Sequence, residues 1–341
     1  MYVAPRPTEE DDPLFAVRLA IMPVAGFMIG MGLGSPLPMI YPTMMFSLLA
    51  ANRKAFNPQR IFAAPIMFSV VLWIMSTLVV MLQGMPMLLV AVMSLIYFAA
   101  FYMMQRTGNS LGMLIAVGGV LMSIMGLGSY QAMDYLRAEM TKAALLSAVV
   151  IPLLYALLPP RTTQLAVDVY TPAHPDQHAM RAAIRTVVLL ALSAYLYTIL
   201  DSSNLMLAIG ALFVLVFPTR RSVWQEAGQR SFSVILGGGL ALGILALLTV
   251  SAHFTVLVCA VMLATLWLGQ KMVTGRLPAM AYQDAASVMI SLVGSALATS
   301  EPSFTFLQRA TLTIIGAVLA AVATSLLEAL LLKQPVEAAL R

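Results

Sequence analysis

Long apolar runs, separated by short polar breaks, dominate the pattern along this chain. The runs are about 18–22 residues long and do not alternate, which is typical of membrane-spanning helices and not of barrel strands. Helices also satisfy their own backbone hydrogen bonds in lipid. We therefore predict an all-α, polytopic transmembrane bundle of about twelve helices. The predicted spans are residues 14–33, 37–51, 61–82, 86–104, 110–128, 139–158, 182–200, 204–218, 231–250, 253–270, 279–298 and 306–330.

Two of these spans, 37–51 and 204–218, are short for a bilayer. The first lies among Pro36, Pro38 and Pro42, and proline breaks regular helix because it lacks the amide donor. Short or interrupted spans at matching places in two halves of a chain are typical of a transport site. This pairing predicts the position of a substrate pathway.

The basic residues repeat along the chain. Arg53 follows Arg18 by 35 residues and Arg220 follows Arg185 by 35, so both pairs have the same offset of 167 (185 − 18 and 220 − 53). An apolar sequence whose pattern occurs twice along the chain indicates two structural repeats. Each half has an even number of spans, so the repeats are expected to be parallel. The predicted division is a first six-helix repeat at 1–158, a cytoplasmic linker at 159–180, a second repeat at 181–332 and a cytoplasmic tail at 333–341.

Charge predicts the orientation. The chain has 61% hydrophobic and 10% charged residues, far below the roughly 25% charged of a soluble domain. With the N-terminus in the cytoplasm, three of the 19 Lys and Arg residues fall outside: Arg137, Lys142 and Arg309. The other sixteen lie inside, as the positive-inside rule requires. We predict a multi-pass bacterial inner-membrane protein with both termini cytoplasmic, and the bias explains the net charge without a nucleic-acid partner.

Several function classes are disfavoured by motifs that the sequence lacks. Cys259 is the single cysteine, so we expect neither an intrachain disulfide nor a metal cluster. No GxxxxGK[ST], HExxH, GxSxG or CxxC pattern occurs. We therefore expect no enzyme activity, no cofactor and no ATP-driven pump within this one chain.

Each half opens with an arginine, followed by a short second helix, a basic loop and a third helix that begins after another arginine. In the second half these parts are Arg185, DSSNLMLAIGALFVLVFP, TRRSVWQEAGQR and SFSVILGGGLALG. The pattern resembles the fusaric acid resistance and aromatic acid exporter family, without the large cytoplasmic domains of many members. The resemblance implies proton-driven efflux of aromatic carboxylic acids, or similar organic anions, together with a periplasmic membrane-fusion adaptor.

Five residues are candidates for substrate binding. An arginine can clamp a carboxylate through two hydrogen bonds, which suggests this role for Arg18 and Arg185. Arg60 and Arg230 are candidates for a cationic entrance that gathers anions at the inner face. The alternative is that these arginines anchor the helices at the headgroups. Pro42 is the fifth candidate, because it breaks the second span where a substrate would pass.

Other ionisable residues are candidates for proton coupling or for exit. Asp284 lies within the eleventh span, with Ser287, Ser291 and Ser295 at helical spacing, and a carboxylate within a span is a functional candidate. The alternative is pairing with Lys271 or Arg276. His253 and Asp201 lie at outer ends of spans and are weaker candidates for proton coupling. Arg137 and Arg309 are candidates for an outer exit site, or for pairing with Asp134 and Glu301.

The sequence predicts a secondary, proton-driven exporter of small organic anions. The alternative is a non-transporting scaffold or assembly subunit of an efflux complex. The lipid bilayer is an expected partner in both cases, and a homo-oligomer is compatible with either.

Overall fold

The computed structural model of the chain describes residues 6–165, 177–199, 205–296 and 302–332. Within these ranges the chain forms twelve α-helices and no strand, which confirms the predicted all-α bundle. The helices are α1 (Phe15–Gly32), α2 (Ile40–Ala51), α3 (Pro58–Leu82), α4 (Pro86–Thr107), α5 (Ser110–Gly128), α6 (Tyr130–Leu157), α7 (His178–Ile199), α8 (Leu205–Leu215), α9 (Arg220–Val250), α10 (Phe254–Thr274), α11 (Ala279–Ala296) and α12 (Pro302–Leu331).

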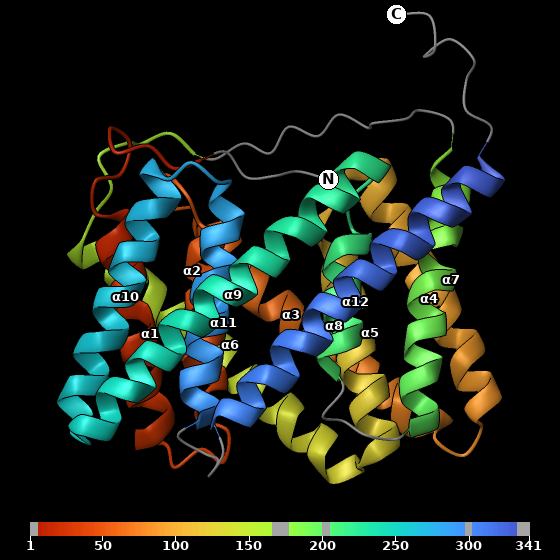
Figure 1. The fold of residues 1–341 in the computed structure, drawn as a ribbon, viewed down its shortest axis with the longest axis horizontal. Coiled ribbons are helices and arrows are strands. Elements are labelled where there is room, and N and C mark those ends of the chain that lie inside the picture. Colours follow the sequence, from red (N-terminus) through yellow and green to blue (C-terminus); the bar gives the residue numbers. More distant parts are fainter. Residues whose placement is uncertain (1–5, 166–176, 200–204, 297–301, 333–341) are drawn as a thin grey trace, which may run out of the picture.

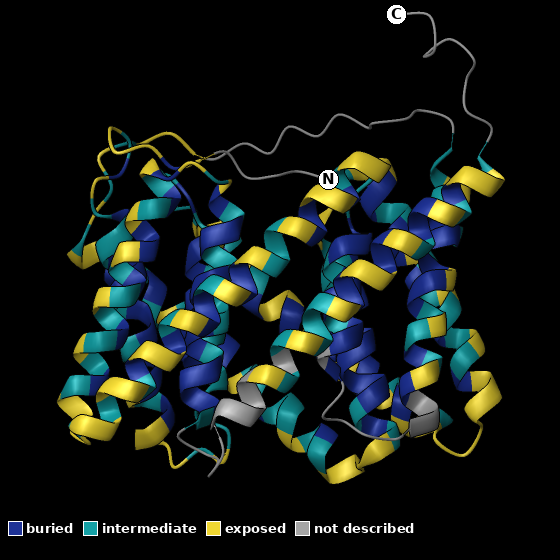
Figure 2. Cartoon of the chain, in the orientation of Figure 1, coloured by how far each residue is buried: buried dark blue, intermediate teal, exposed yellow. Residues whose placement is uncertain are grey.

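The outside of the bundle is apolar. Among the described residues, nine helices are long and apolar enough to cross a membrane. Large hydrophobic side chains point outward, and Met81, Met87 and Val250 are 79%, 86% and 85% exposed. Figure 2 shows exposed positions along the outer faces of the helices. Such a surface requires lipid around it. The chain is therefore a multi-pass membrane protein.

The three remaining helices, α2, α8 and α11, are not among these nine: α2 and α8 are short, and α11 contains polar residues. The first two have 12 and 11 residues, which agrees with the short second and eighth spans read from the sequence. Proline explains where α2 begins: Pro36 and Pro38 precede its first residue, and Pro42 lies in the first turn, where no intrahelical amide donor is needed. The third, α11, carries Gln283, Asp284 and several serines.

The helices assemble into two bundles that each mix the two halves of the sequence. One bundle contains α1, α2, α10 and α11, and the other contains α4, α5, α7 and α8; they lie left and right in Figure 1. Two separate clusters of buried apolar side chains follow the same division. In particular, α1 packs on α10 and α4 packs on α7. The halves are therefore interlocked, because each contributes helices to both bundles.

Four long helices connect the bundles. α9 packs on α11 and α12 packs on α8, and these two long helices contact each other where they run obliquely across the front of Figure 1. In the first half α3 packs on α5, α6 packs on α2, and α3 contacts α6. These contacts of the first half match those of the helices six places later in the second half, so that α3 corresponds to α9 and α6 to α12. Such a correspondence is expected of a chain built from two structural repeats.

The basic stretch before the predicted span 231–250 is helical, which corrects its interpretation as a loop. α9 begins at Arg220, where the side chain of Thr219 accepts from the amide of Ser222 in a capping box. A favourable i,i+4 pair between Glu226 and Arg230 adds to it. Arg230 consequently lies on the third turn of a long helix and not at the helix start.

Candidate functional site

A cavity of about 530 Å³ lies between the two bundles. It adjoins a second cavity of about 830 Å³, since both are lined by Thr43, Met44, Ser47, Phe213 and Ser291. The first cavity reaches the second turn of α9, and the second reaches the second turn of α12. The two helices begin at opposite ends of the bundle (Figure 1). The two adjoining cavities therefore follow one another from one side of the membrane toward the other.

Three charged side chains line the first cavity among its otherwise mostly apolar described residues. Arg230 Nη2 lies 2.9 Å from Asp284 Oδ2 and 3.2 Å from Glu226 Oε1. The guanidinium carbon also lies 4.4 Å from the ring centre of Phe213. Within the described part of the chain, Nε of Arg230 has no hydrogen-bond partner. Arg230 thus holds two carboxylates through a single nitrogen, while its Nε is buried beside them with its hydrogen-bond capacity unused.

The wall of the cavity along α11 contains four polar side chains among apolar ones. Gln283, Asp284, Ser287 and Ser291 all line it. The spacing of three, four and seven residues places side chains on one face of a helix, and the two serines therefore accompany Asp284 as the sequence indicates. Ser295, expected on the same face, is buried instead and donates to the carbonyl oxygen of Leu292 at 3.0 Å. The polar wall therefore ends near Ser291.

The opposite wall, along α5, is apolar. Met113, Leu114 and Val117 line it, and each precedes its counterpart Gln283, Asp284 or Ser287 by 170 residues (283 − 113). The same offset relates Arg60 to Arg230 (230 − 60). At this offset a leucine of the first half corresponds to the acid of the second half. A cavity with one polar and one apolar wall suits an amphiphilic ligand.

Arg18 and Arg185, which belong to the first helix of each half, are buried outside these cavities, where they connect helix ends to one another. Arg18 is fully buried, forms an ion pair with Asp12, donates to the carbonyl oxygen of Leu158 and lies 4.3 Å from the ring centre of Tyr155. These contacts join the start of α1 to the end of α6. Since Arg18 does not line either cavity, its geometry favours a structural role.

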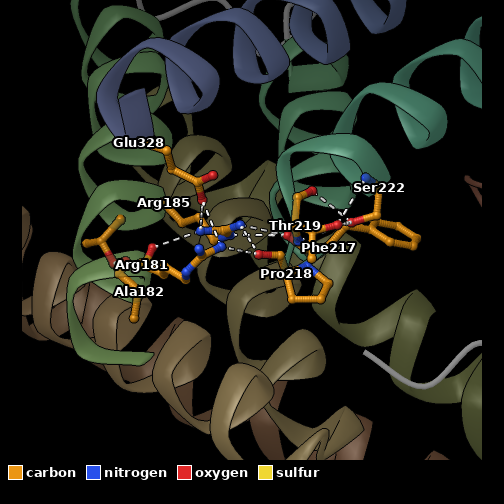
Figure 3. Close-up of polar contacts among 9 residues, drawn as sticks. Arg181, Ala182, Arg185, Phe217, Pro218, Thr219, Ser222 and Glu328 are labelled. Atoms are coloured by element: carbon orange, nitrogen blue, oxygen red, sulfur yellow. Dashed lines mark hydrogen bonds and ion pairs between the residues drawn. The ribbon is translucent and has the colours of Figure 1, made fainter. Parts of the chain in front are cut away.

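Arg185 is bound in the same manner in the second half (Figure 3). It is fully buried and lies 3.0 Å from Glu328 Oε1, and it donates to the carbonyl oxygens of Phe217 at 2.8 Å and Pro218 at 3.1 Å. Arg181 also approaches the same glutamate oxygen at 3.7 Å. The cluster fixes α7, the end of α8 and the end of α12 to one another. Arg185, like Arg18, does not line the cavity.

The other substrate-binding candidates lie beside the cavity. Arg60 is in the first turn of α3, where its amide donates to the side-chain oxygen of Asn57, and Ala64, one turn later, lines the cavity. Pro42 faces α1, because a Cβ added at Gly26 would lie 2.5 Å from its Cα. The cavity is lined by the next residues, Thr43 and Met44. Neither candidate contributes its own side chain to the space.

Of the candidate residues at the outer ends of the spans, one is exposed, one is ion-paired and two lie outside the described residues or side chains. His253 is exposed, and its backbone carbonyl accepts from the amides that begin α10. Arg137 forms an ion pair with Asp134, donates to Ser76 Oγ at 3.3 Å and lies 3.9 Å from the ring centre of Trp73. Its pairing with Asp134 is the alternative that the sequence left open. Asp201 and the side chain of Arg309 lie outside the described residues.

The sequence did not indicate which groups would pair in the cavity. The alternative for Asp284 was pairing with Lys271 or Arg276, but its partner is Arg230, 54 positions earlier on α9. Glu226 was not singled out, although its i,i+4 spacing to Arg230 was a readable signal. Arg53 is a further addition at the edge of the site, where it is buried and donates to Gln283 Oε1 at 3.3 Å.

Comparison with known proteins adds one finding. A family described as "Protein of unknown function (DUF2955)" matches residues 15–154, which is 140 of the 341 residues and covers α1 to nearly the end of α6. No curated protein and no solved structure was found to match the chain. The matched family has no assigned function, so the resemblance to aromatic acid exporters stays a prediction.

Proposed function

We propose that this protein is a secondary transporter of small organic anions, with aromatic carboxylates as the leading substrates and protons as the coupling ions. The observation that carries the proposal is the position of Arg230, between Asp284 and Glu226 in a cavity between two interlocked bundles. A carboxylate can take up the donor capacity of this guanidinium, and an acid beside it can exchange a proton.

The two walls of the cavity support an aromatic substrate with one charged end. The anion would bind at Arg230 on the polar side, and its ring would lie against Leu114 and Val117. A volume of about 530 Å³ falls within the range of roughly 300–1,000 Å³ of small-ligand sites. Phe213, which already packs on the guanidinium, adds an aromatic surface to the site.

The proposed setting is the bacterial inner membrane with both termini in the cytoplasm. The excess of basic residues at the end of the bundle where α9 begins supports this orientation. Export is the direction implied by the resemblance to aromatic acid exporters, and a periplasmic membrane-fusion adaptor is the partner that it implies. In this arrangement the anion enters near Glu226 and leaves near Gln308.

Transport in proteoliposomes tests the proposal. The purified chain should carry radiolabelled benzoate across the bilayer, and Arg230→Gln should reduce the flux by at least tenfold because the guanidinium is lost. Arg60→Gln is the matched control, since it removes the corresponding arginine of the first half without changing the cavity lining. Absence of flux for every aromatic acid tried, with normally folded protein, would favour the non-transporting scaffold subunit.

A further inference from the structure

We infer that the anion and a proton bind this site together, with Asp284 as the proton acceptor. The inference rests on the proposed function, because it concerns the same cavity and the same guanidinium. It specifies which species moves with the substrate. The inference starts from the net charge of the site and from the hydrogen-bond donors of Arg230 that are not already used.

The count of charges is unfavourable for an anion alone. With Glu226, Asp284 and Arg230 all ionised, the empty site has a net charge of −1. A bound carboxylate would place three acids around one guanidinium in a mostly apolar cavity, where like charges repel strongly. One proton taken up with the anion returns the net charge to −1. The occupied site then has the same charge as the empty one.

Asp284 is better placed than Glu226 to take that proton. Glu226 is on the same helix as Arg230, one turn away, and its side chain is 6% exposed. Asp284 reaches Arg230 from α11, and its side chain is 21% exposed and lines the cavity. Protonation of Asp284 weakens its bond to Arg230 Nη2 and releases that nitrogen for the anion. Nε of the same guanidinium is buried and has no hydrogen-bond partner among the described residues. Nε and Nη2 lie on one edge of the guanidinium, and such an edge is the two-pronged donor that binds a carboxylate once both nitrogens are released to it.

The charged groups on the other elements around α11 are engaged elsewhere. Arg53, after α2, donates to Gln283 Oε1 at 3.3 Å and to the carbonyl oxygen of Ala50 at 3.4 Å. On α10, Lys271 lies 5.9 Å from the ring centre of Trp267. On α12, Glu328 is held by Arg185. Among the described residues, therefore, the charges that act on Asp284 most directly are Arg230 and Glu226.

This coupling determines what drives the flux. Binding linkage is reciprocal, so a bound anion favours protonation of Asp284 and a proton on Asp284 favours binding of the anion. The pair crosses the membrane with no net charge, as the neutral acid, and the membrane potential does no work on it. An inward proton gradient then opposes export. The outward gradient of the acid itself would power efflux through this site, in contrast to the proton-driven efflux implied by the family resemblance.

Calorimetry on the purified protein measures the coupling directly. Titration with benzoate at neutral pH in two buffers of different ionisation enthalpy gives the number of protons exchanged per anion bound. We expect uptake of about one proton and an affinity that falls by about tenfold per pH unit at alkaline pH, the slope for one linked proton. Benzenesulfonate, which is anionic throughout this range, should behave in the same way and excludes titration of the ligand itself.

Two variants make the assignment to Asp284 specific. Asp284→Asn should bind benzoate without proton uptake and without pH dependence, because its amide cannot be ionised. Asp134→Asn, at an ion pair outside the cavity lining, should retain the wild-type uptake. Proton release, or the absence of uptake in the wild type, overturns the inference, and so does continued uptake by Asp284→Asn. If neither probe binds at any pH, the proposed function fails and the inference fails with it.

Discussion

Arg230 and Asp284 form a 2.9 Å ion pair between α9 and α11, inside a mostly apolar cavity. Their helices also make a close backbone contact, because a Cβ added at Gly237 would lie 2.2 Å from the carbonyl oxygen of Ala285. The residue after Asp284 is thus packed directly against the helix that carries Arg230. A rigid attachment of this kind fixes the geometry of the pair, which a site that discriminates between ligands requires.

Gly237→Ala should damage the site, whereas Gly239→Ala should not. The first change forces a methyl group into the α9–α11 contact, and a Cβ at Gly239 meets nothing within 4 Å. Alanine favours a helix over glycine by roughly 1 kcal/mol, so the control should be neutral or slightly more stable. We expect a lower unfolding midpoint and a loss of benzoate flux for Gly237→Ala alone. Equal behaviour of the two variants would show that the contact does not support the site.

Glu328→Ala should destabilise the protein without altering the cavity. It leaves the fully buried Arg185 without its carboxylate, a change that typically costs about 3–5 kcal/mol. Thermal unfolding in detergent should show a clearly lower midpoint, and the double variant Arg185→Met/Glu328→Met should recover most of the loss. Arg106→Met, which removes an exposed arginine, is the control and should change stability by less than about 1 kcal/mol. Flux per folded molecule should survive in the double variant; its loss would place Arg185 in the transport site.

Ser291→Phe should separate binding from passage. Ser291 lines both cavities, so a phenyl group there narrows their junction but leaves Arg230 and Asp284 unchanged. We expect benzoate to bind with near wild-type affinity while flux in proteoliposomes falls by tenfold or more. Thr249→Phe, which adds the same group at an exposed position near the end of α9, should transport normally. Unchanged flux through Ser291→Phe would mean that the route lies elsewhere.

Cysteine labelling tests the orientation. In a Cys259→Ala background, Thr162→Cys after α6 should react with a membrane-impermeant thiol reagent only from the cytoplasmic side. Ser129→Cys, between α5 and α6 at the other end of the bundle, should react only from outside. The prediction follows from the basic residues, which gather at the Thr162 end. The reverse pattern would invert the proposed entry and exit.

Much of the fold could be predicted because it depends on local pattern. The lengths of the apolar runs predicted the helices, and the spacing of Ser287 and Ser291 from Asp284 predicted the polar side chains that α11 turns toward the cavity. The helical start of α9 was missed because the basic composition of its first turns resembled a loop. Its cap at Thr219 nevertheless involves residues only three positions apart.

The interlocking of the two halves and the partner of Asp284 could not be predicted in this way. Packing of α1 on α10 buries the same apolar side chains that packing within one half would bury, so the hydrophobic pattern does not distinguish the two arrangements. The pair Arg230–Asp284 depends on that arrangement, because it requires α9 and α11 to lie side by side. Arg18 and Arg185 had a recognisable pattern, but their burial against Asp12 and Glu328 becomes visible only in three dimensions.

The most direct test of the central claim, that an organic anion binds at Arg230 within the cavity, is protection of a cysteine beside it. In the Cys259→Ala background, Ser287→Cys places a thiol on the polar wall, one turn from Asp284. We predict that benzoate slows the reaction of this thiol with a maleimide, and that Arg230→Gln abolishes the protection. Benzoate transport by a chain whose Ser287→Cys thiol reacts equally fast with and without the anion would contradict the account.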